Sequence, residues 1–136
     1  MELSVKAAVN PTEDPNKVKA AVLNLVDMEL TMVEENGQSY VVGVSHSLSS
    51  LSPLRKLIGK AGIARLAREV LRSSAVGDTI EIKLHKQAAF AGAVSFVSQD
   101  GESPMGPIII TITAVDPGKV IDWIAPPPRR LDGLHR

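Results

Sequence analysis

Three arginines recur in one segment at a spacing that could bind phosphate groups. Arg65, Arg68 and Arg72 stand at positions i, i+3 and i+7, which places them on one face of a helix. Guanidinium groups form charge-assisted hydrogen bonds with phosphate oxygens, and a cluster of them can neutralise a polyanion. The sequence offers further donors nearby: Arg55, Lys56, Lys60, Lys86 and Gln87. This pattern favours nucleic-acid binding, but an amphipathic helix also turns polar side chains toward solvent without any ligand.

A glycine pair lies just before the arginine segment. Gly59 and Gly62 separate two helical patterns and resemble the GxxG turn of KH domains, which clamps a nucleic-acid backbone. Glycines between helices are equally typical of simple helix boundaries. The pair is therefore compatible with RNA binding without requiring it.

Patterns for catalysis or metal binding are missing from the sequence. The histidines His46, His85 and His135 lack the spacing of metal ligands, and the chain has no cysteine. Hydroxyls flank His46, but neighbouring residues of a strand point to opposite faces, and no GxSxG motif accompanies them. No Walker loop or dinucleotide fingerprint is present. We therefore expect a protein that is not an enzyme, with no cofactor, no metal and no evident small-molecule substrate.

Length and composition indicate one globular domain. The chain has 136 residues, of which 44% are hydrophobic and 22% charged, which excludes a disordered chain and leaves room for one core. No apolar run reaches the roughly 18 residues of a membrane span, and the first residues do not resemble a signal peptide. We expect a cytoplasmic protein without a membrane partner.

Charge is distributed unevenly along the chain, although the net charge is zero. Residues 1–50 carry a net charge of −4, residues 51–90 a net charge of +5, and residues 91–136 a net charge of −1. Such a dipolar surface could dock a polyanion on its basic side. Alternatively, the arginines could meet the acidic first third of a second copy in a homodimer.

Periodicity predicts the strands. Apolar residues alternate with polar ones, or β-branched residues cluster, in six segments: residues 3–9, 28–34, 40–44, 80–84, 90–97 and 108–115. Asn36-Gly37 favours a tight hairpin between the second and third segments. The pattern of residues 108–115 is typical of a central strand, and residues 99–107 have a loop composition.

Capping residues and apolar stripes predict the helices. Asp14-Pro15 and Asp116-Pro117 each combine a side-chain cap with a proline in the first turn. Residues 54–58 predict a short helix broken at Gly59 and Gly62, and a second helix follows, with Gly77 ending its segment. Its apolar face contains Ile63, Leu66, Ala67, Val70 and Leu71. Together these elements predict a single α+β domain of residues 1–124, with a mainly antiparallel sheet, one layer of helices and a tail of residues 125–136.

Three segments resemble signature segments of an archaea-specific family of uncharacterised proteins. They are residues 9–15 (VNPTEDP), 84–90 (LHKQAAF) and 102–108 (ESPMGPI), within a likeness that runs from about Val5 to Thr113. The family is described as α+β domains similar in fold to the large-subunit ribosomal protein that binds 5S ribosomal RNA, and its members tend to dimerise. The resemblance implies this fold, a homodimer and RNA as a partner.

Two features depart from the family pattern. His85 stands where asparagine is expected before the lysine, and the pair Gly59 and Gly62 does not belong to the pattern. The small residues after Gln87 predict a tight corner in which Lys86 and Gln87 are exposed donors, either as a binding edge or at a packing or dimer contact. We therefore expect a non-catalytic RNA-binding module, with a dimeric structural or protein-interaction module as the alternative.

Overall fold

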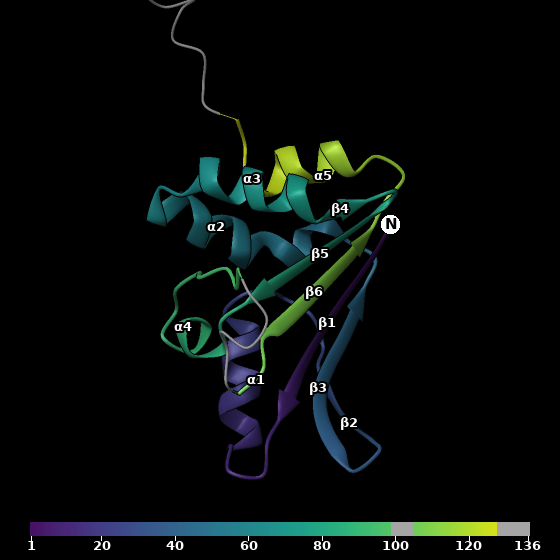
Figure 1. Ribbon diagram of the computed structural model, residues 1–136, viewed down its shortest axis with the longest axis vertical. Coiled ribbons are helices and arrows are strands. Elements are labelled where there is room, and N and C mark those ends of the chain that lie inside the picture. Colours follow the sequence, from purple (N-terminus) through teal and green to yellow (C-terminus); the bar gives the residue numbers. More distant parts are fainter. Residues whose placement is uncertain (99–104, 128–136) are drawn as a thin grey trace, which may run out of the picture.

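A single antiparallel sheet organises the computed structural model, which describes residues 1–98 and 105–127. Within these residues the sheet has six strands in the order β2-β3-β1-β6-β5-β4. The strands are β1 (Glu2–Val9), β2 (Thr31–Glu35), β3 (Gln38–Ser45), β4 (Ala75–Val76), β5 (Thr79–Leu84) and β6 (Ile108–Thr113). β1 and β6 pair at the centre of the sheet (Figure 1), as the β-branched run of β6 predicts.

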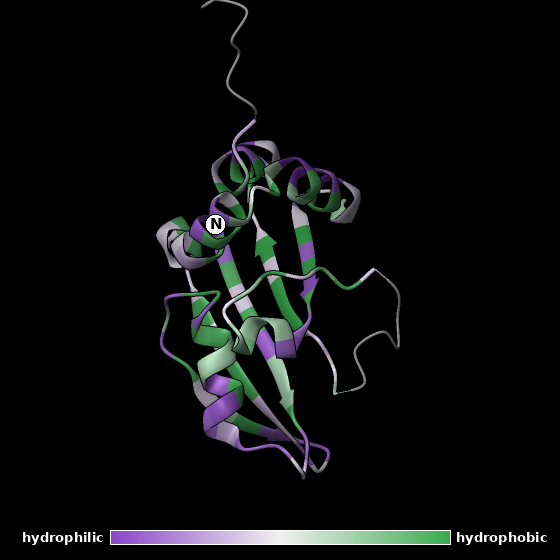
Figure 2. Cartoon of the chain, turned by 90° about the vertical axis from the view of Figure 1, so that its left-hand side faces the viewer, coloured by the Kyte–Doolittle hydropathy of each residue, from purple (hydrophilic) through white to green (hydrophobic). Residues whose placement is uncertain are grey.

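Helices cover one face of this sheet. They are α1 (Pro15–Leu23), α2 (Ser52–Ala61), α3 (Ala64–Ser74), α4 (Lys86–Phe90) and α5 (Pro117–Ile124), with a 3-10 turn at Leu48–Leu51 before α2. Buried and more accessible residues alternate along β1 and β6, so one face of the sheet packs against the core and the other does not. We call the second one the outer face. Figure 2 shows apolar residues interspersed with polar ones in both strands and helices, and the buried apolar residues of both form one core. The predicted α+β class is confirmed.

Helix starts follow the predicted capping chemistry. The Asp14 side chain accepts a hydrogen bond from the Asn16 backbone N–H at 2.9 Å, and α1 begins at Pro15. The Asp116 side chain accepts from the Lys119 backbone N–H at 3.3 Å at the start of α5. Because these caps satisfy first-turn donors, both helices begin where the sequence predicts.

The β2–β3 hairpin turns at Asn36 and Gly37, whose φ angles are 51° and 81°. These positive angles suit a tight hairpin and confirm the predicted turn. β2 begins at Thr31 rather than at residue 28. The preceding residues 28–30 instead cross close to Gly43 of β3, where an added Cβ would lie 2.9 Å from the Glu29 carbonyl oxygen. Only a glycine leaves room for this crossing.

The region around α2 and α3 differs from the prediction in four ways. α2 continues through Gly59 and ends at Gly62, whose φ of 68° terminates the helix. One glycine costs a helix only about 1 kcal/mol, and the burial of Leu54 and Ile58 offsets it. α3 ends at Ser74, and Gly77 lies in the turn between β4 and β5. Of these two strands, only β5 was predicted. Leu66 is exposed because α3 buries Ala67 and Leu71 instead.

The prediction of a strand at residues 90–97 is wrong. The chain forms helix α4 at the expected corner, and only Phe96 makes an antiparallel bridge, to Leu84. Small alanines have high helix propensity, and burial of Ala89 against α1 favours a helical turn over a strand. Most of the predicted loop, residues 99–104, lies outside the described residues, as do tail residues 128–136. The division into residues 1–124 and 125–136 stays a prediction.

The close approach at Gly43 can be tested by adding one methyl group. We expect Gly43→Ala to lower the free energy of unfolding by about 1–3 kcal/mol, because the new Cβ would overlap a backbone carbonyl. Gly59→Ala is the matched control: nothing lies within 4 Å of its added Cβ, and alanine should stabilise the helix by about 0.5–1 kcal/mol. Denaturant unfolding measures both, and equal stability of the two variants would contradict the crossing.

Candidate nucleic-acid interface

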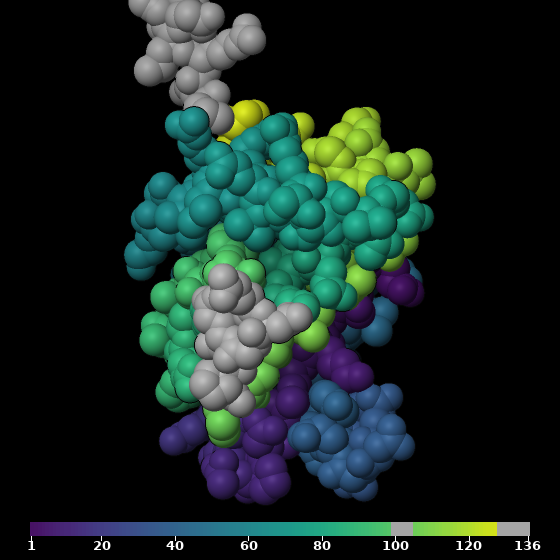
Figure 3. Space-filling model, in the orientation of Figure 1, coloured from purple at the N-terminus to yellow at the C-terminus, as the bar shows by residue number. Residues whose placement is uncertain are grey.

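Five basic side chains share the surface of α2 and α3. Each is exposed, and α2 and α3 form the upper part of one side of the molecule (Figure 3). We call this set the basic helical surface: Arg55, Lys56, Lys60, Arg65 and Arg72. Four of the predicted site residues, with Lys56 added, thus lie exposed on these two neighbouring helices.

Two of these arginines have partners that leave them accessible. The Arg55 guanidinium carbon lies 4.9 Å from the centre of the Trp123 ring, a cation–π contact that orients its side chain. Arg65 Nε lies 4.0 Å from Glu69 Oε1, but its side chain is 90% exposed. Such a long exposed pair contributes little. Both guanidinium groups can therefore still reach a phosphate.

Lys60 and Arg72 have no ion-pair partner among residues 1–98 and 105–127. Lys60 lies in the last turn of α2 and Arg72 in the last turn of α3. Cations in the last turn of a helix interact favourably with the helix dipole. Basic residues are therefore favourable at these two positions even when no ligand binds. Both stay available for an anion.

Arg68 does not belong to the exposed surface, contrary to the expectation that the three arginines share a solvent-exposed face. Its side chain is only 12% exposed, and its Nη1 lies 2.7 Å from Asp122 Oδ1. The same nitrogen donates to the Ala125 carbonyl at 2.9 Å. Because these bonds join α3 to the end of α5, Arg68 holds two helices together and is not a free phosphate donor.

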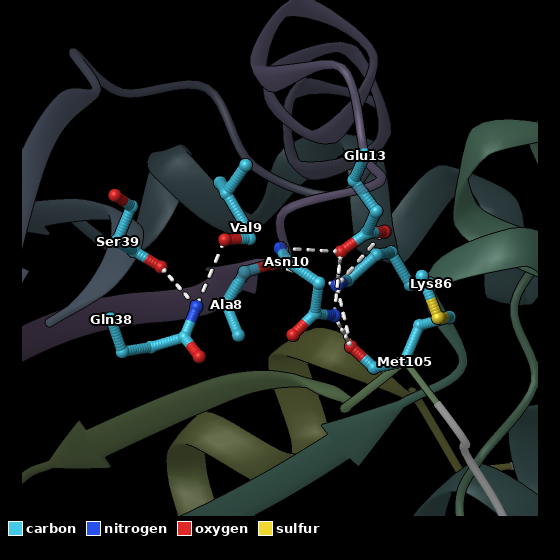
Figure 4. A network of polar contacts seen from close by, with 8 residues as sticks. All are labelled: Ala8, Val9, Asn10, Glu13, Gln38, Ser39, Lys86 and Met105. Carbon is cyan, nitrogen blue, oxygen red and sulfur yellow. Dashed lines mark hydrogen bonds and ion pairs between the residues drawn. The ribbon is translucent and has the colours of Figure 1, made fainter.

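The prediction that Lys86 is an exposed donor is wrong. Lys86 is 4% exposed, and its Nζ donates to the carbonyls of Ala8 at 2.7 Å and Met105 at 2.8 Å. It also lies 3.0 Å from Glu13 Oε1 and 3.2 Å from Oε2. Figure 4 shows these contacts converging on one ammonium group. A buried ammonium needs such partners to offset its desolvation, so Lys86 has no donor left for a ligand. Gln87, next to it, is exposed as predicted.

Glu13 is the counter-charge of Lys86. Its Oε1 also accepts from the Asn10 backbone N–H at 3.0 Å and from Asn10 Nδ2 at 2.8 Å. Burial raises the pKa of this carboxyl, but the hydrogen bonds from Asn10 and Lys86, with the lysine charge, outweigh burial and hold the pKa below its ordinary value of 4.5. Glu13 therefore stays ionised. We call Asn10, Glu13 and Lys86, with the carbonyls of Ala8 and Met105, the Lys86 network.

The Lys86 network joins the three segments that carry the family resemblance. Asn10 and Glu13 lie in residues 9–15, Lys86 in residues 84–90 and Met105 in residues 102–108. Sequence reasoning missed this network, because periodicity treats a lysine at a corner as exposed. The available signal was the appearance of an amide and a carboxylate, Asn10 and Glu13, in one signature segment and of a lysine in another.

The described residues hold neither a cluster of metal ligands nor a membrane-spanning helix. They contain no group of three or more histidine, cysteine, aspartate or glutamate side chains that could hold a metal ion. None of the described helices is long and apolar enough to cross a membrane.

Comparisons with known proteins agree on one family. A family model described as RNA binding matches residues 2–114. The UPF0201 protein of Aeropyrum pernix is 45% identical over 129 residues, which span 93% of this chain and 86% of that protein. The UPF0201 protein of Pyrococcus abyssi is 41% identical over 134 residues, 98% of this chain and 94% of that protein.

Solved structures share the fold. The crystal structure of the UPF0201 protein from Methanococcus jannaschii matches with a TM-score of 0.80 and 34% identity, over 95% of this chain and 96% of that chain. A protein from Sulfolobus solfataricus, only 13% identical, matches with a TM-score of 0.63 over 92% of this chain and 97% of that chain, and shows the same fold.

Removing the buried ammonium should be costly. We expect Lys86→Met to lower the free energy of unfolding by about 3–5 kcal/mol, because it leaves the Glu13 carboxylate, whose side chain is only 14% exposed, without its counter-charge. Lys6→Met is the matched control, since the Lys6–Glu35 pair is as short, at 2.8 Å, but exposed and should contribute about 0–1 kcal/mol. Equal losses in thermal or denaturant unfolding would contradict the structural role of Lys86.

The lowered pKa of Glu13 gives a second test. A carboxyl whose pKa falls on folding stabilises the protein above its unfolded-state pKa, and this contribution disappears as the pH falls through the folded-state pKa. We therefore expect the difference in unfolding free energy between the wild type and Glu13→Gln to be largest near pH 7 and to shrink below about pH 4.5. Denaturant unfolding across this pH range measures it, and a difference that is independent of pH would contradict the ionised network.

Proposed function

The chain belongs to the RNA-binding family that includes the archaeal UPF0201 proteins, and from this premise we propose that it binds RNA through the basic helical surface without catalysing a reaction. Arg55, Lys56, Lys60, Arg65 and Arg72 would contact phosphate oxygens. Arg68 and Lys86 would hold the scaffold that presents them. Contacts with phosphate oxygens depend on the charge and shape of an RNA and not on its base sequence, so a structured RNA is the expected ligand.

One contrast between the two faces of the sheet supports this proposal. On the outer face, Lys6 Nζ lies 2.8 Å from Glu35 Oε1. The 4.0 Å separation of Lys83 Nζ from Glu81 Oε1 is as long as that of Arg65 from Glu69 and contributes as little. The strands nevertheless place three acids beside these two bases on this face: Glu2, Glu35 and Glu81. On the basic helical surface, Lys56, Lys60 and Arg72 have no ion-pair partner in the described part of the chain. The positive charge that remains for a polyanion therefore lies on the helical side.

A second candidate function, a homodimer, is favoured by the outer face. No helix of residues 1–98 and 105–127 covers this face, and Val44 on it is 59% exposed, with Val33 also exposed. Its strands carry two bases, Lys6 and Lys83, beside three acids, Glu2, Glu35 and Glu81, so that its charges largely cancel. A neutral, β-branched sheet face suits packing against a second copy better than it suits a polyanion. Dimerisation through this face would leave the basic helical surface free for RNA.

RNA binding can be tested by titration with a structured RNA at several salt concentrations. We expect affinity to fall steeply with salt, and Lys56→Gln combined with Lys60→Gln to weaken binding and reduce the slope of log affinity against log salt by about 2, because two phosphate contacts disappear. Lys6→Gln combined with Lys83→Gln removes the same charge from the outer face and should leave the slope unchanged. Absence of binding at low salt, or equal losses in both double variants, would contradict the proposal.

The dimer can be tested by measuring mass in solution. We expect a mass twice that of the chain, and a single-chain mass for Val44→Lys, since a buried unpaired charge would disrupt the packed face. Val76→Lys, a change at an exposed valine of the edge strand β4, should remain dimeric. A wild type that is monomeric at all working concentrations would remove this candidate.

A further inference from the structure

A cavity of about 310 Å³ opens between α1 and α4. Its apolar wall is formed by Val18, Ala21 and Phe90, and its polar rim by Thr12, Asp14, Lys17 and Gln87. Glu13 and Lys86 also line it. A cavity of this size with an apolar wall and a few polar groups is typical of a binding site for a small ligand.

The walls of this cavity are fixed at both ends. The ion pair of Glu13 with Lys86 joins the start of α1 to the start of α4. At the other end, Asn24 Nδ2 donates to the Ala89 carbonyl at 2.8 Å and so joins the end of α1 to α4. Because both helices are tied, the cavity is already formed before a ligand binds, and little ordering cost is added.

Phe90 is unusual among the aromatic residues of the chain. It is 51% exposed, whereas Tyr40, Phe96 and Trp123 are each partly buried. Tyr40 and Trp123 already contact the cations of Lys6 and Arg55. An exposed ring beside a cavity leaves an aromatic face for stacking, which a core phenylalanine would not.

We propose that this cavity binds one unpaired nucleobase of the RNA, an inference that rests on the proposed RNA-binding function. The base stacks on Phe90, and the Gln87 amide offers the donor and acceptor pair that matches the N6 and N7 edge of adenine. The exposed ammonium of Lys17 contacts the adjoining phosphate. The basic helical surface then supplies charge, and the cavity supplies recognition of an unstacked base.

The position of the cavity would allow one RNA to contact both the cavity and the basic helical surface. α1 and α4 lie next to each other on the same side of the sheet as α2, in both Figure 1 and Figure 2. A single RNA could therefore contact α2 and place a bulged nucleotide between α1 and α4. The outer face of the sheet would take no part.

Three RNA hairpins test the proposal with the full chain: one with a single bulged adenosine, one with an abasic nucleotide at the bulge, and one fully paired. We expect the hairpin with the adenosine bulge to bind at least about fivefold more tightly than the hairpin with the abasic bulge, because stacking of the base on an aromatic ring adds to the binding free energy. Phe90→Ala should abolish this difference without changing affinity for the paired hairpin. Phe90→Trp should preserve this difference in affinity. That result would show that Phe90→Ala acts through loss of the aromatic ring and not through loss of folding.

The remaining outcomes contradict either the base-binding cavity alone or RNA binding as a whole. Equal affinity for adenosine and abasic bulges, or a loss on Phe90→Ala that is the same for bulged and paired hairpins, overturns the base-binding cavity while salt-dependent binding keeps the proposed function. No binding of any hairpin at low salt overturns both.

Discussion

The enclosed ammonium group of Lys86 constrains the structure more than any other polar contact described. A buried charge costs several kcal/mol unless every donor finds a partner, and Lys86 finds its partners at the end of β1, in the turn before α1 and just before β6. Satisfying it requires segments separated by up to 78 positions to meet. The same requirement sets α4 against α1 and so shapes the cavity between them.

Some basic residues are bound within the fold and others are available to a ligand, and the two groups differ in burial. Arg68 and Lys86 are satisfied within the fold, whereas Lys60 and Arg72 project from helix ends without an ion-pair partner among the described residues. The outer face neutralises its own bases. A chain with no net charge can therefore present one positive side to a polyanion, because its acids are concentrated elsewhere. RNA binding needs this separation more than it needs an excess of basic residues.

Sequence reasoning predicted what short-range physics controls. Strand alternation, the Asp14 and Asp116 caps and the Asn36-Gly37 hairpin follow from local chemistry, and the structure confirms them. It failed where distant residues decide: residues 86–90 form helix α4, which packs on α1, and the strand predicted at residues 90–97 is reduced to one bridge at Phe96. Lys86 looked exposed because its acceptors are remote in the sequence. Of the predicted site, the structure keeps the exposure of Arg55, Lys60, Arg65, Arg72 and Gln87. It loses Arg68 and Lys86, whose partners no periodicity reveals.

The most direct measurement of this account is the rate at which an amine-acetylating reagent modifies each lysine, read by mass spectrometry with and without a structured RNA. The account predicts that Lys86 reacts far more slowly than the exposed lysines in both states, and that RNA slows Lys56 and Lys60 but not Lys6. Modification of Lys86 in the free protein as fast as Lys6 would contradict it, because the ammonium would then be accessible to solvent.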